Sequence, residues 1–466
     1  RMKLCRTTNL VRAPESRRMA YTLGMSRSWF GTDGVRGVAG TAPMRAEDAF
    51  ALSVAATERI REVTGHDPLW VLGKDPRISS DMLAHAFMAG ALSRGADVVD
   101  VGTLPTPGVS YLTRSLGANA GVMISASHNP FEDNGIKLFA ATGSKLADAD
   151  EMEIEAWLAR DATMLAPVTG GAVGRRRFPA DATPEAYLDF LLAQAPRLDA
   201  LRLGIDCANG AASAVAPDLF ARLGAQVDTV HAAPDGVNIN VECGSTEPDA
   251  VRNLVRERGL DVGVAFDGDG DRALLIDARG RLVSGDHMLA IIARVRGDRE
   301  LVGTAMTNLG IERWLDDHGV TLHRAAVGDR YVQEMLVERG LRLGGEASGH
   351  LLFLDLAPTG DGMMTALQTL AAVQASGTPL EVWMDEIPVF PQVLTSVRVP
   401  TDSKEAIVAD PKLASAVRAV AARLGSEGRV NVRPSGTEPR IRVMVEGAED
   451  HRIRAEAEEL VTLIET

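Results

Sequence analysis

From Ser28 onward the sequence repeats one order of segments: a short apolar run, a turn rich in Gly, Asp or Asn, and an Ala-rich stretch with helical character. Clear examples of the apolar run are 69–73, 96–101 and 201–206. Strands and helices that alternate in this way predict α/β domains. Sheets of such domains bind ligands where their strands end, so polar residues directly after an apolar run are the first candidates for function.

The length of the chain predicts several domains. At 466 residues it exceeds what one hydrophobic core can hold, and roughly three or four domains are expected. Residues 163–177, with three glycines and three consecutive arginines, predict a linker with a solvated basic run. Alternating apolar residues from Ile441, followed by helical spacing, indicate a small final α+β domain. The predicted fold is three similar mixed α/β domains plus a smaller C-terminal α+β domain, with boundaries at 25–175, 176–278, 279–386 and 387–466.

Residues 1–24 differ from the rest of the sequence. They carry six basic residues against one acid, Glu15, and show no apolar periodicity. The apolar core of a secretory signal is missing. We interpret this stretch as a disordered extension or as the result of a mis-set start upstream of Met25.

Composition limits the partners. A net charge of -14 argues against nucleic acid, because phosphate-backbone binding relies on surplus Lys and Arg. No apolar run approaches the roughly 18 residues of a membrane helix. Cys5, Cys207 and Cys243 are too far apart for a disulfide framework or a CxxC pair. We expect a cytoplasmic protein without nucleic-acid or membrane partners, and the sequence leaves open whether it forms a homodimer.

The segment from Gly121 to Pro130 places a hydroxyl, an imidazole and an amide on one turn, directly behind an apolar run. A hydroxyl at this edge of a sheet can carry a transferred group. Turns also use Ser, Asn and Pro for conformational reasons, so the segment alone favours a plain turn about as strongly as a nucleophile. Its meaning depends on the other motifs of the chain.

An acidic loop, 267–272, has the sequence Asp-Gly-Asp-Gly-Asp-Arg and follows the apolar run 262–266. Alternate side chains of an extended loop point the same way, so three carboxylates can converge on a hard cation such as Mg2+. An EF-hand is excluded, because Arg272 stands where that loop needs Gly and Ala278 where it needs Glu. Two alternatives stay open: a solvated acidic turn, and a phosphatase loop in which Asp267 itself attacks phosphorus.

Two glycine-containing loops are suited to a sugar phosphate. Loop 433–439 combines a guanidinium, two hydroxyls and a glycine whose backbone can approach an oxyanion. Loop 344–350 offers Glu346, Ser348 and His350 amid glycines, a set suited to sugar hydroxyls. Each loop alone is also compatible with an ordinary glycine turn. The chain has neither a Walker motif nor GxGxxG, so a nucleotide is not indicated.

Two basic residues complete the candidates. Lys137 lies ten residues after Ser127, and its ammonium could act as acid or base if its pKa were lowered, although most lysines lie on the surface. Arg36, in segment 30–37, could be an ordinary ion-pair partner.

In this order and spacing, the motifs resemble the α-D-phosphohexomutase superfamily over essentially the whole chain from Ser28. The residue sequences of these motifs are similar to those of the bacterial branch that acts on glucosamine phosphates. The segments that carry this likeness are 30–37, 124–130 with 133–137, 235–240, 327–331 and 435–439. The resemblance implies four domains around a central active-site cleft, and each domain contributes one loop: phosphoserine, metal, sugar or phosphate.

The resemblance also implies a role for individual residues. Ser127, not Ser125, would be the phosphoserine, and one of its oxygens would bind a single Mg2+. The other metal ligands implied are Asp267, Asp269 and Asp271. The other catalytic residues implied are Lys137 as general base and acid, Arg36, His128 and His350. The substrate-binding residues implied are Glu346, Ser348, Asp329, Arg433, Ser435, Gly436 and Thr437.

The reaction implied is the interconversion of glucosamine 6-phosphate and glucosamine 1-phosphate. Phospho-Ser127 would phosphorylate O1, giving glucosamine 1,6-bisphosphate as intermediate and primer, which turns end over end before returning its 6-phosphate. The product would feed UDP-N-acetylglucosamine and cell-wall precursor synthesis.

One departure from the branch concerns the sugar. Ala347 stands where the branch usually has Gln, which bears on amino-sugar preference more than on mutase chemistry. The alternatives are a phosphomannomutase or phosphoglucomutase, a Mg2+-dependent sugar phosphatase, and a phosphosugar-binding regulator without activity.

Overall fold

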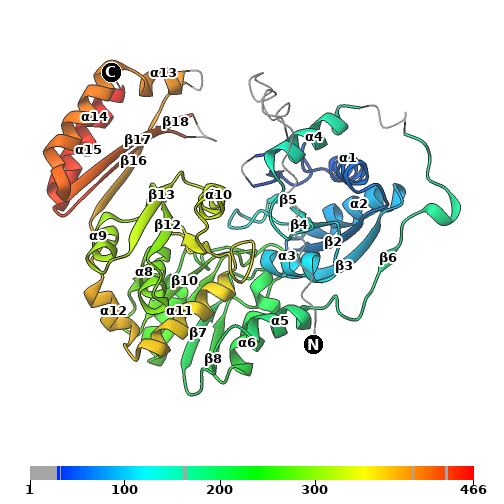
Figure 1. Ribbon diagram of the computed structural model, residues 1–466, viewed down its shortest axis with the longest axis horizontal. Coiled ribbons are helices and arrows are strands. Elements are labelled where there is room, and N and C mark those ends of the chain that lie inside the picture. Colours follow the sequence, from blue (N-terminus) through cyan, green and yellow to red (C-terminus); the bar gives the residue numbers. More distant parts are fainter. Residues whose placement is uncertain (1–28, 32, 161–164, 401–402, 436–438, 466) are drawn as a thin grey trace, which may run out of the picture.

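The protein forms four units that follow one another in an arc, and the C-terminal unit lies across from the first (Figure 1). Each unit is built on its own β-sheet. This confirms the predicted fold class, three α/β units and a smaller α+β unit. The computed structural model describes residues 29–31, 33–160, 165–400, 403–435 and 439–465, so the predicted extension 1–24 lies outside the described residues.

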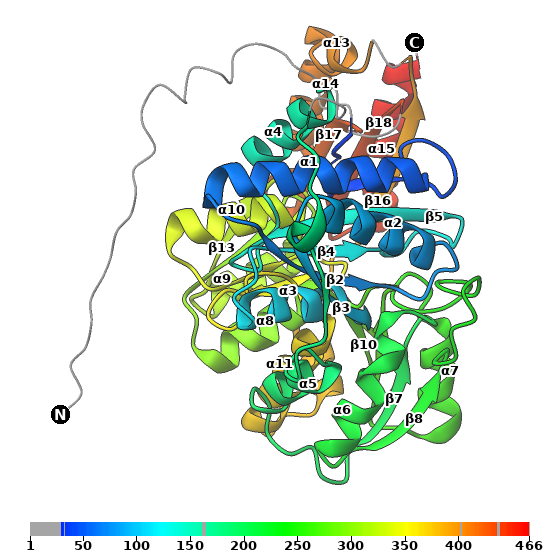
Figure 2. The ribbon, with the colours of Figure 1, turned by 90° about the vertical axis from the view of Figure 1, so that its right-hand side faces the viewer.

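The first unit has a six-stranded sheet in the order β1-β5-β4-β2-β3-β6, in which β5 runs antiparallel to both neighbours. Side chains of β2 alternate between the faces: Trp70 and Leu72 pack under α1, α2 and α4, whereas Val71 packs with α3. Helices therefore cover both faces of the sheet (Figure 2). The strands are β1 (Val35–Val38), β2 (Leu69–Lys74), β3 (Asp97–Thr103), β4 (Ala120–Ile124), β5 (Asp133–Ala140) and β6 (Arg176–Arg177). The helices are α1 (Ala46–Thr64), α2 (Ser80–Ser93), α3 (Thr106–Ser115) and α4 (Asp148–Leu158).

The segment predicted as a linker, 163–177, ends in a strand that was not expected. Strand β6 pairs with β3 at the edge of the first sheet. Arg176 and Arg177 are exposed, but they form ion pairs with Asp100 and Asp97 at 2.7 and 2.6 Å. These carboxylates on β3 offset the repulsion within the basic run, through a long-range contact that composition does not reveal.

The second unit has a five-stranded sheet in the order β11-β10-β9-β7-β8. All residues of β9 and β10 are buried, because α7 packs on one face of the sheet and α11 on the other. The strands are β7 (Arg202–Asp206), β8 (Gln226–Val230), β9 (Val262–Phe266), β10 (Ala273–Asp277) and β11 (Leu282–Val283). The helices are α5 (Pro184–Leu192), α6 (Ala216–Arg222) and α7 (Asp249–Arg258).

The third unit has a four-stranded sheet in the order β13-β12-β14-β15, and one hydrophobic core runs from it into the second unit. This shared core fixes the sugar loop relative to the acidic loop. The strands are β12 (Glu300–Thr304), β13 (Thr321–Ala325), β14 (Leu343–Gly345) and β15 (Leu351–Phe353). The helices are α8 (Gly285–Arg296), α9 (Leu309–Asp317), α10 (Asp329–Arg339), α11 (Gly362–Ser376) and α12 (Leu380–Glu386).

The fourth unit has a three-stranded antiparallel sheet in the order β16-β18-β17 and a core of its own. The alternation predicted from Ile441 is β18, and its buried residues pack against Ile453 and Leu460 of the last helix. The strands are β16 (Gln392–Arg398), β17 (Gly428–Pro434) and β18 (Arg440–Gly447). The helices are α13 (Lys404–Val408), α14 (Pro411–Leu424) and α15 (Asp450–Glu465).

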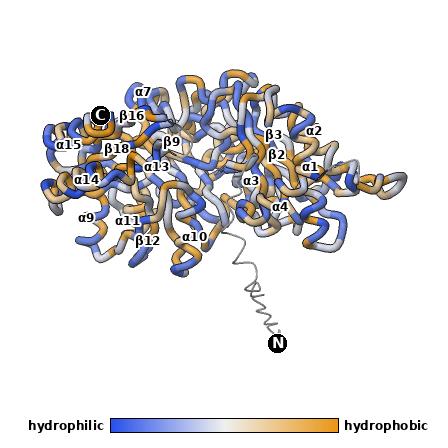
Figure 3. Tube along the Cα trace, turned by 90° about the horizontal axis from the view of Figure 1, so that it is seen from above, coloured by the Kyte–Doolittle hydropathy of each residue, from blue (hydrophilic) through white to orange (hydrophobic). Residues whose placement is uncertain are grey.

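Hydrophobic and hydrophilic segments alternate along the whole described chain (Figure 3). Accordingly, none of the helices within the described ranges is long and apolar enough to cross a membrane.

A stability prediction arises at the start of α8, where Asp286 is only 3% exposed and accepts the backbone N–H of Asn308 at 2.9 Å. Burial raises the pKa of Asp286 from its ordinary 3.8 to about 6. The folded state therefore holds a proton that the unfolded state releases. Stability should fall as pH rises from about 4 to about 6, by ~3 kcal/mol from this group.

We expect Asp286→Asn to remove this part of the pH dependence, because an amide oxygen can still accept the Asn308 bond without titrating. Urea unfolding of both proteins across this pH range measures the difference. Parallel pH profiles would contradict the assignment.

Candidate active site

Loops from all four units line one cavity of about 1280 Å³. The predicted site residues on its wall are Arg36, His128, Asp271, Asp329, Glu346, Ser348, His350, Arg433 and Ser435. Ser127, Lys137, Asp267 and Asp269 are buried. Ser127 contacts Asp267, Lys137 contacts Asp269, and the two carboxylates lie within 4.8 Å of each other. Gly436 and Thr437 fall outside the described residues. The structure thus brings together every predicted site residue that it describes.

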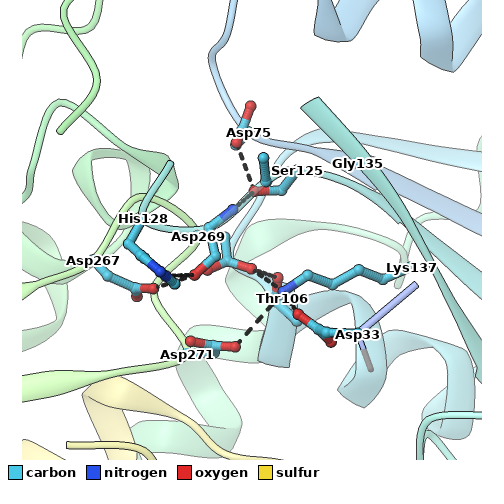
Figure 4. Close-up of polar contacts among 12 residues, drawn as sticks. Asp33, Asp75, Thr106, Ser125, His128, Gly135, Lys137, Asp267, Asp269 and Asp271 are labelled. Atoms are coloured by element: carbon cyan, nitrogen blue, oxygen red, sulfur yellow. Dashed lines mark hydrogen bonds and ion pairs between the residues drawn. The ribbon is translucent and has the colours of Figure 1, made fainter. Parts of the chain in front are cut away.

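Ser127 and Ser125 have different surroundings, although both follow β4. The Ser125 hydroxyl donates to Asp75 Oδ2 at 2.6 Å (Figure 4). It also accepts the backbone N–H of Ser127 at 3.0 Å. The Ser127 hydroxyl instead donates to Asp267 Oδ2 at 2.6 Å, across the boundary between the first two units. Ser127 is 1% exposed and has a φ of 54°, a left-handed conformation that a tight turn imposes. Of the two hydroxyls, only that of Ser127 reaches the acidic loop.

Two side chains hold the Ser127 turn from outside it. Arg77 donates to the carbonyls of Ser127 and Asn129 at 2.8 and 2.9 Å, and Asn240 donates to the same two carbonyls at 2.9 and 3.0 Å. Arg77 is itself paired with buried Asp75 at 2.8 Å. Sequence reasoning missed Asp75 and Arg77, although they directly follow an apolar run. Asn240 lies in a segment that carried the resemblance, but no role was predicted for it.

The acidic loop packs closely against this turn. Asp267, Asp269 and Asp271 are buried, with carboxylate oxygens within 4.8 Å of one another. A Cβ on Gly268 would lie 2.4 Å from the Ser127 carbonyl oxygen, so only glycine permits this approach. Thr106, at the start of α3, donates to Asp269 Oδ2 at 2.5 Å and was not predicted.

The acidic loop fits a divalent cation. Burial raises the pKa of Asp267 well above its usual range, and the charges of Asp271 and Asp269 raise it further. Within the described part of the chain, Asp269 Oδ1 and Asp271 Oδ1 are buried without a hydrogen-bond partner. Carboxylate crowding and orphaned oxygens indicate a site built around positive charge, and three hard oxygen donors suit Mg2+.

Lys137 lies beneath the cavity, not on the surface. It is 1% exposed, and its Nζ lies 2.8 Å from Asp269 Oδ2, 3.0 Å from Asp33 Oδ2 and 3.7 Å from Asp271 Oδ2. Burial alone would lower the pKa of Lys137, but the three carboxylates raise it well above its usual value. Lys137 is therefore an ammonium here, and can act as a base only after those anions are neutralised.

His128 and His350 have opposite character. His128 Nδ1 lies 3.3 Å from the Ser127 hydroxyl, and burial together with Arg272 and Arg36 lowers the pKa of this imidazole to about 4. His350 lies 3.6 Å from Asp271 and 3.5 Å from a second carboxylate, that of Asp329. These carboxylates outweigh burial and raise the pKa of His350. His128 is thus neutral near pH 7, whereas His350 favours its protonated form more than an ordinary histidine does.

The sugar loop faces the cavity from the third unit. Glu346 Oε1 accepts the backbone N–H of Gly328 at 2.9 Å, and Ser348 Oγ is buried without a hydrogen-bond partner among the residues described. Lys145, from the first unit, lies 2.5 Å from Asp329 and also pairs with Asp33. Lys145 therefore joins the first and third units across the cavity, a contact that the sequence did not predict.

Two arginines face the cavity from the fourth unit. Arg433 on β17 lies directly opposite Arg442 on β18. Burial, and then the charge of Arg442, lower the pKa of Arg433. Like charges placed opposite each other repel, and an anion between them relieves the repulsion. No functional role was predicted for Arg442, yet it strengthens the case for a phosphate site.

A substitution at Gly360 tests the position of His350. A Cβ there would lie 2.3 Å from His350 Nε2. We expect Gly360→Ala to displace the imidazole from Asp271 and Asp329 and to lower kcat about 100-fold or more, the size of effect expected for lost general acid–base assistance. Steady-state kinetics measures this, and unchanged kcat in a folded variant would show that the ring position is unimportant.

Family models for phosphoglucomutase/phosphomannomutase match the chain in four parts. Alpha/beta/alpha domains I, II and III match residues 27–164, 185–280 and 284–390, and the C-terminal domain matches 394–463. The domain boundaries that we predict from the sequence, at 25–175, 176–278, 279–386 and 387–466, stay predictions.

Curated relatives are similar over nearly the whole chain. Phosphoglucosamine mutase from Deinococcus deserti is 52% identical over 94% of this chain and 98% of its own length. Phosphoglucosamine mutase from a strain of Thermus thermophilus is 52% identical over 91% of this chain and 94% of its own.

Solved structures share the fold. A phosphoglucomutase/phosphomannomutase family protein from Burkholderia thailandensis has a TM-score of 0.78 at 23% identity, covering 93% of this chain and 96% of that one. Aspergillus fumigatus N-acetylphosphoglucosamine mutase, solved with GlcNAc-6P and magnesium, has a TM-score of 0.67 at 18% identity, covering 97% and 99%. The chain therefore belongs to the α-D-phosphohexomutase superfamily of mutase enzymes and, within it, to the phosphoglucosamine mutase family.

Proposed function

We propose that the protein interconverts glucosamine 6-phosphate and glucosamine 1-phosphate through a phosphoserine at Ser127 and glucosamine 1,6-bisphosphate. The observation that carries this proposal is the 2.6 Å contact of the buried Ser127 hydroxyl with Asp267, next to a cavity that is lined by residues of all four units, among them His128 and Asp271. A nucleophile, a cation site, a sugar loop and an arginine pair in one place are what two successive phosphoryl transfers need.

Separate residues of the chain bind the phosphate, orient the sugar and stabilise the transferring group. Arg433 and Arg442 hold the phosphate that is not reacting, and they accept either end of the sugar bisphosphate. Glu346 and Ser348 bind sugar hydroxyls, so the ring stays oriented in both half-reactions. Arg36, on the cavity wall beside the Ser127 turn, donates to the Ala126 carbonyl at 3.3 Å and offers charge to the transferring phosphoryl group.

Proton transfer falls to Lys137, assisted by His350. Asp267, Asp269 and Asp271, with an oxygen of phospho-Ser127, would hold Mg2+, which would neutralise charge on the transferred group when bound. With a cation on Asp269 and Asp271, these two carboxylates would raise the pKa of Lys137 less, and burial would lower this pKa toward the range in which Lys137 exchanges a proton with the sugar hydroxyl.

The substrate is tested by comparing turnover of glucosamine 6-phosphate with that of mannose and glucose phosphates under Mg2+ and a bisphosphate primer. We expect the amino sugar to have the highest kcat/KM. Faster turnover of a neutral sugar would assign the protein to the phosphomannomutase or phosphoglucomutase alternative.

Ala347 offers a test of sugar preference at one position. It lines the cavity between Glu346 and Ser348, and its backbone carbonyl accepts the N–H of Gly285 at 3.0 Å. We expect Ala347→Gln to keep this backbone contact and to change the preference for amino over neutral sugars by about 10-fold, the usual effect of one hydrogen-bonding side chain. A ratio of kcat/KM values that does not move would exclude position 347 from sugar recognition.

A further inference from the structure

A second group of metal-binding side chains lies in the second unit, outside the cavity. Asp206, His231 and Cys243 bring a carboxylate oxygen, an imidazole nitrogen and a sulfur within 4.8 Å of one another. None of the three lines the cavity or belongs to the acidic loop.

The topology of the second sheet brings these residues together. Asp206 ends β7, and His231 directly follows β8, the parallel neighbour of β7. Cys243 lies in the loop before α7, and the N–H of the next residue, Gly244, donates to Asp206 Oδ2 at 3.0 Å. All three side chains therefore sit at the carboxyl edge of the sheet, where ligands bind in such folds.

The side chains leave coordination capacity unused. His231 Nδ1 is buried and lies 3.2 Å from Asp206 Oδ2, yet it makes no hydrogen bond within the described part of the chain. The two Asp206 oxygens each accept one backbone N–H, from Ala208 and Gly244, and each retains a lone pair. Cys243 is fully buried, and burial together with Asp206 raises the pKa of its thiol to about 12.

We propose that Asp206, His231 and Cys243 form a second cation site that is specific for a thiophilic divalent ion of the Zn2+ type. Sulfur, imidazole and carboxylate are the donors of zinc sites, whereas Mg2+ prefers oxygen alone. On binding, the Cys243 thiol loses its proton to solvent and the thiolate takes its place as ligand. The His231 side chain is 32% exposed, which leaves a path for the ion and for a water as fourth ligand.

The site is connected to the phosphoserine turn. His231 and Cys243 are the two ends of segment 231–243, and this segment carries Asn240, which holds the carbonyls of Ser127 and Asn129. An ion bound to both ends would stiffen the segment and thereby the position of Asn240. The cation is thus structural, and it acts at a distance from the acidic loop.

Co2+ is a suitable probe, because a cobalt–thiolate bond gives a charge-transfer absorption band that oxygen ligands do not. The full-length protein would be titrated with Co2+ in saturating Mg2+, which keeps the acidic loop occupied. We expect one Co2+ per chain with a thiolate band, displaced by Zn2+, and slower amide hydrogen exchange over 231–243.

Three variants make the test specific. Cys243→Ser should abolish the band, and His231→Gln, a change at a partly exposed residue, should weaken Co2+ binding about 10-fold or more, a loss of about 1.4 kcal/mol or more. Cys207→Ser, at a neighbouring cysteine that is also buried, should leave the thiolate band and the Co2+ affinity unchanged. Absence of the band, or a band that survives Cys243→Ser, would overturn the proposal, as would unchanged affinity in folded His231→Gln.

Discussion

Ser127→Ala is expected to abolish turnover, with a loss of about 10^4-fold or more, because a covalent carrier cannot be replaced by binding energy. The variant should also lose phosphate incorporation. Intact-mass analysis of wild-type protein should show one added phosphate that maps to Ser127. The fold should survive, because among the described residues the lost hydroxyl contacts only Asp267 and His128, and the left-handed turn is held by Arg77 and Asn240.

Ser125→Ala is the matched control for this experiment. Ser125 lies on the same turn but holds Asp75 and the Ser127 N–H, so its loss should reduce the rate while phosphate still maps to Ser127. Two outcomes would contradict the mutase proposal. Phosphate release that persists in Ser127→Ala would indicate a phosphatase with Asp267 as nucleophile. Tight phosphosugar binding without turnover in wild-type protein, under Mg2+ and primer, would indicate a regulator.

Much of this site could be predicted from the sequence, because its parts are local. The segment that carries Ser127 and the acidic loop each place polar residues directly after an apolar run, and loop 433–439 combines a guanidinium, two hydroxyls and a glycine. The choice of Ser127 over Ser125 came from the family resemblance. The α/β alternation likewise reflects strand and helix periodicities that are properties of short segments. Such features need no knowledge of the tertiary structure.

The residues that were missed act through long-range contacts. Thr106 looks like an ordinary helix start, yet its hydroxyl reaches Asp269, more than 160 positions later. Lys145 follows a strand of the first unit and forms an ion pair with Asp329 of the third unit. In the sequence, Arg442 is typical of the polar face of a strand, whereas in the structure Arg433 of β17 lies opposite it. Polar residues of these types are common on surfaces, and only the fold shows which of them turn inward.

The protonation state of Lys137, the predicted base, could not be predicted from the sequence, because it depends on the charges around this side chain. Sequence alone suggests that a catalytic lysine requires a lowered pKa, whereas the carboxylates of Asp269, Asp33 and Asp271 raise it. Two of these carboxylates, Asp269 and Asp271, also belong to the cation site, so they hold Lys137 as an ammonium when no cation is bound. Metal binding and the protonation state of Lys137 are coupled through shared oxygens, of which Asp269 Oδ2 is the nearest at 2.8 Å.

Asp269→Asn tests this coupling, and we expect it to lower kcat about 10^3-fold at a fixed Mg2+ concentration. The change removes one of three carboxylates from the cation site and replaces the nearest anion of Lys137 with a neutral amide. The Mg2+ concentration for half-maximal activity should rise by about 10-fold or more, because site affinity depends strongly on the number of charged ligands.

Thr106→Val is the control, because it removes the neutral partner of the same Asp269 oxygen and keeps all three carboxylates. Its Mg2+ midpoint should move much less than that of Asp269→Asn. A general loosening of the site would instead shift both variants alike. If Asp269→Asn lost rate with an unchanged Mg2+ midpoint, Asp269 would act on Lys137 alone, and the cation would have to be held by Asp267 and Asp271 without it.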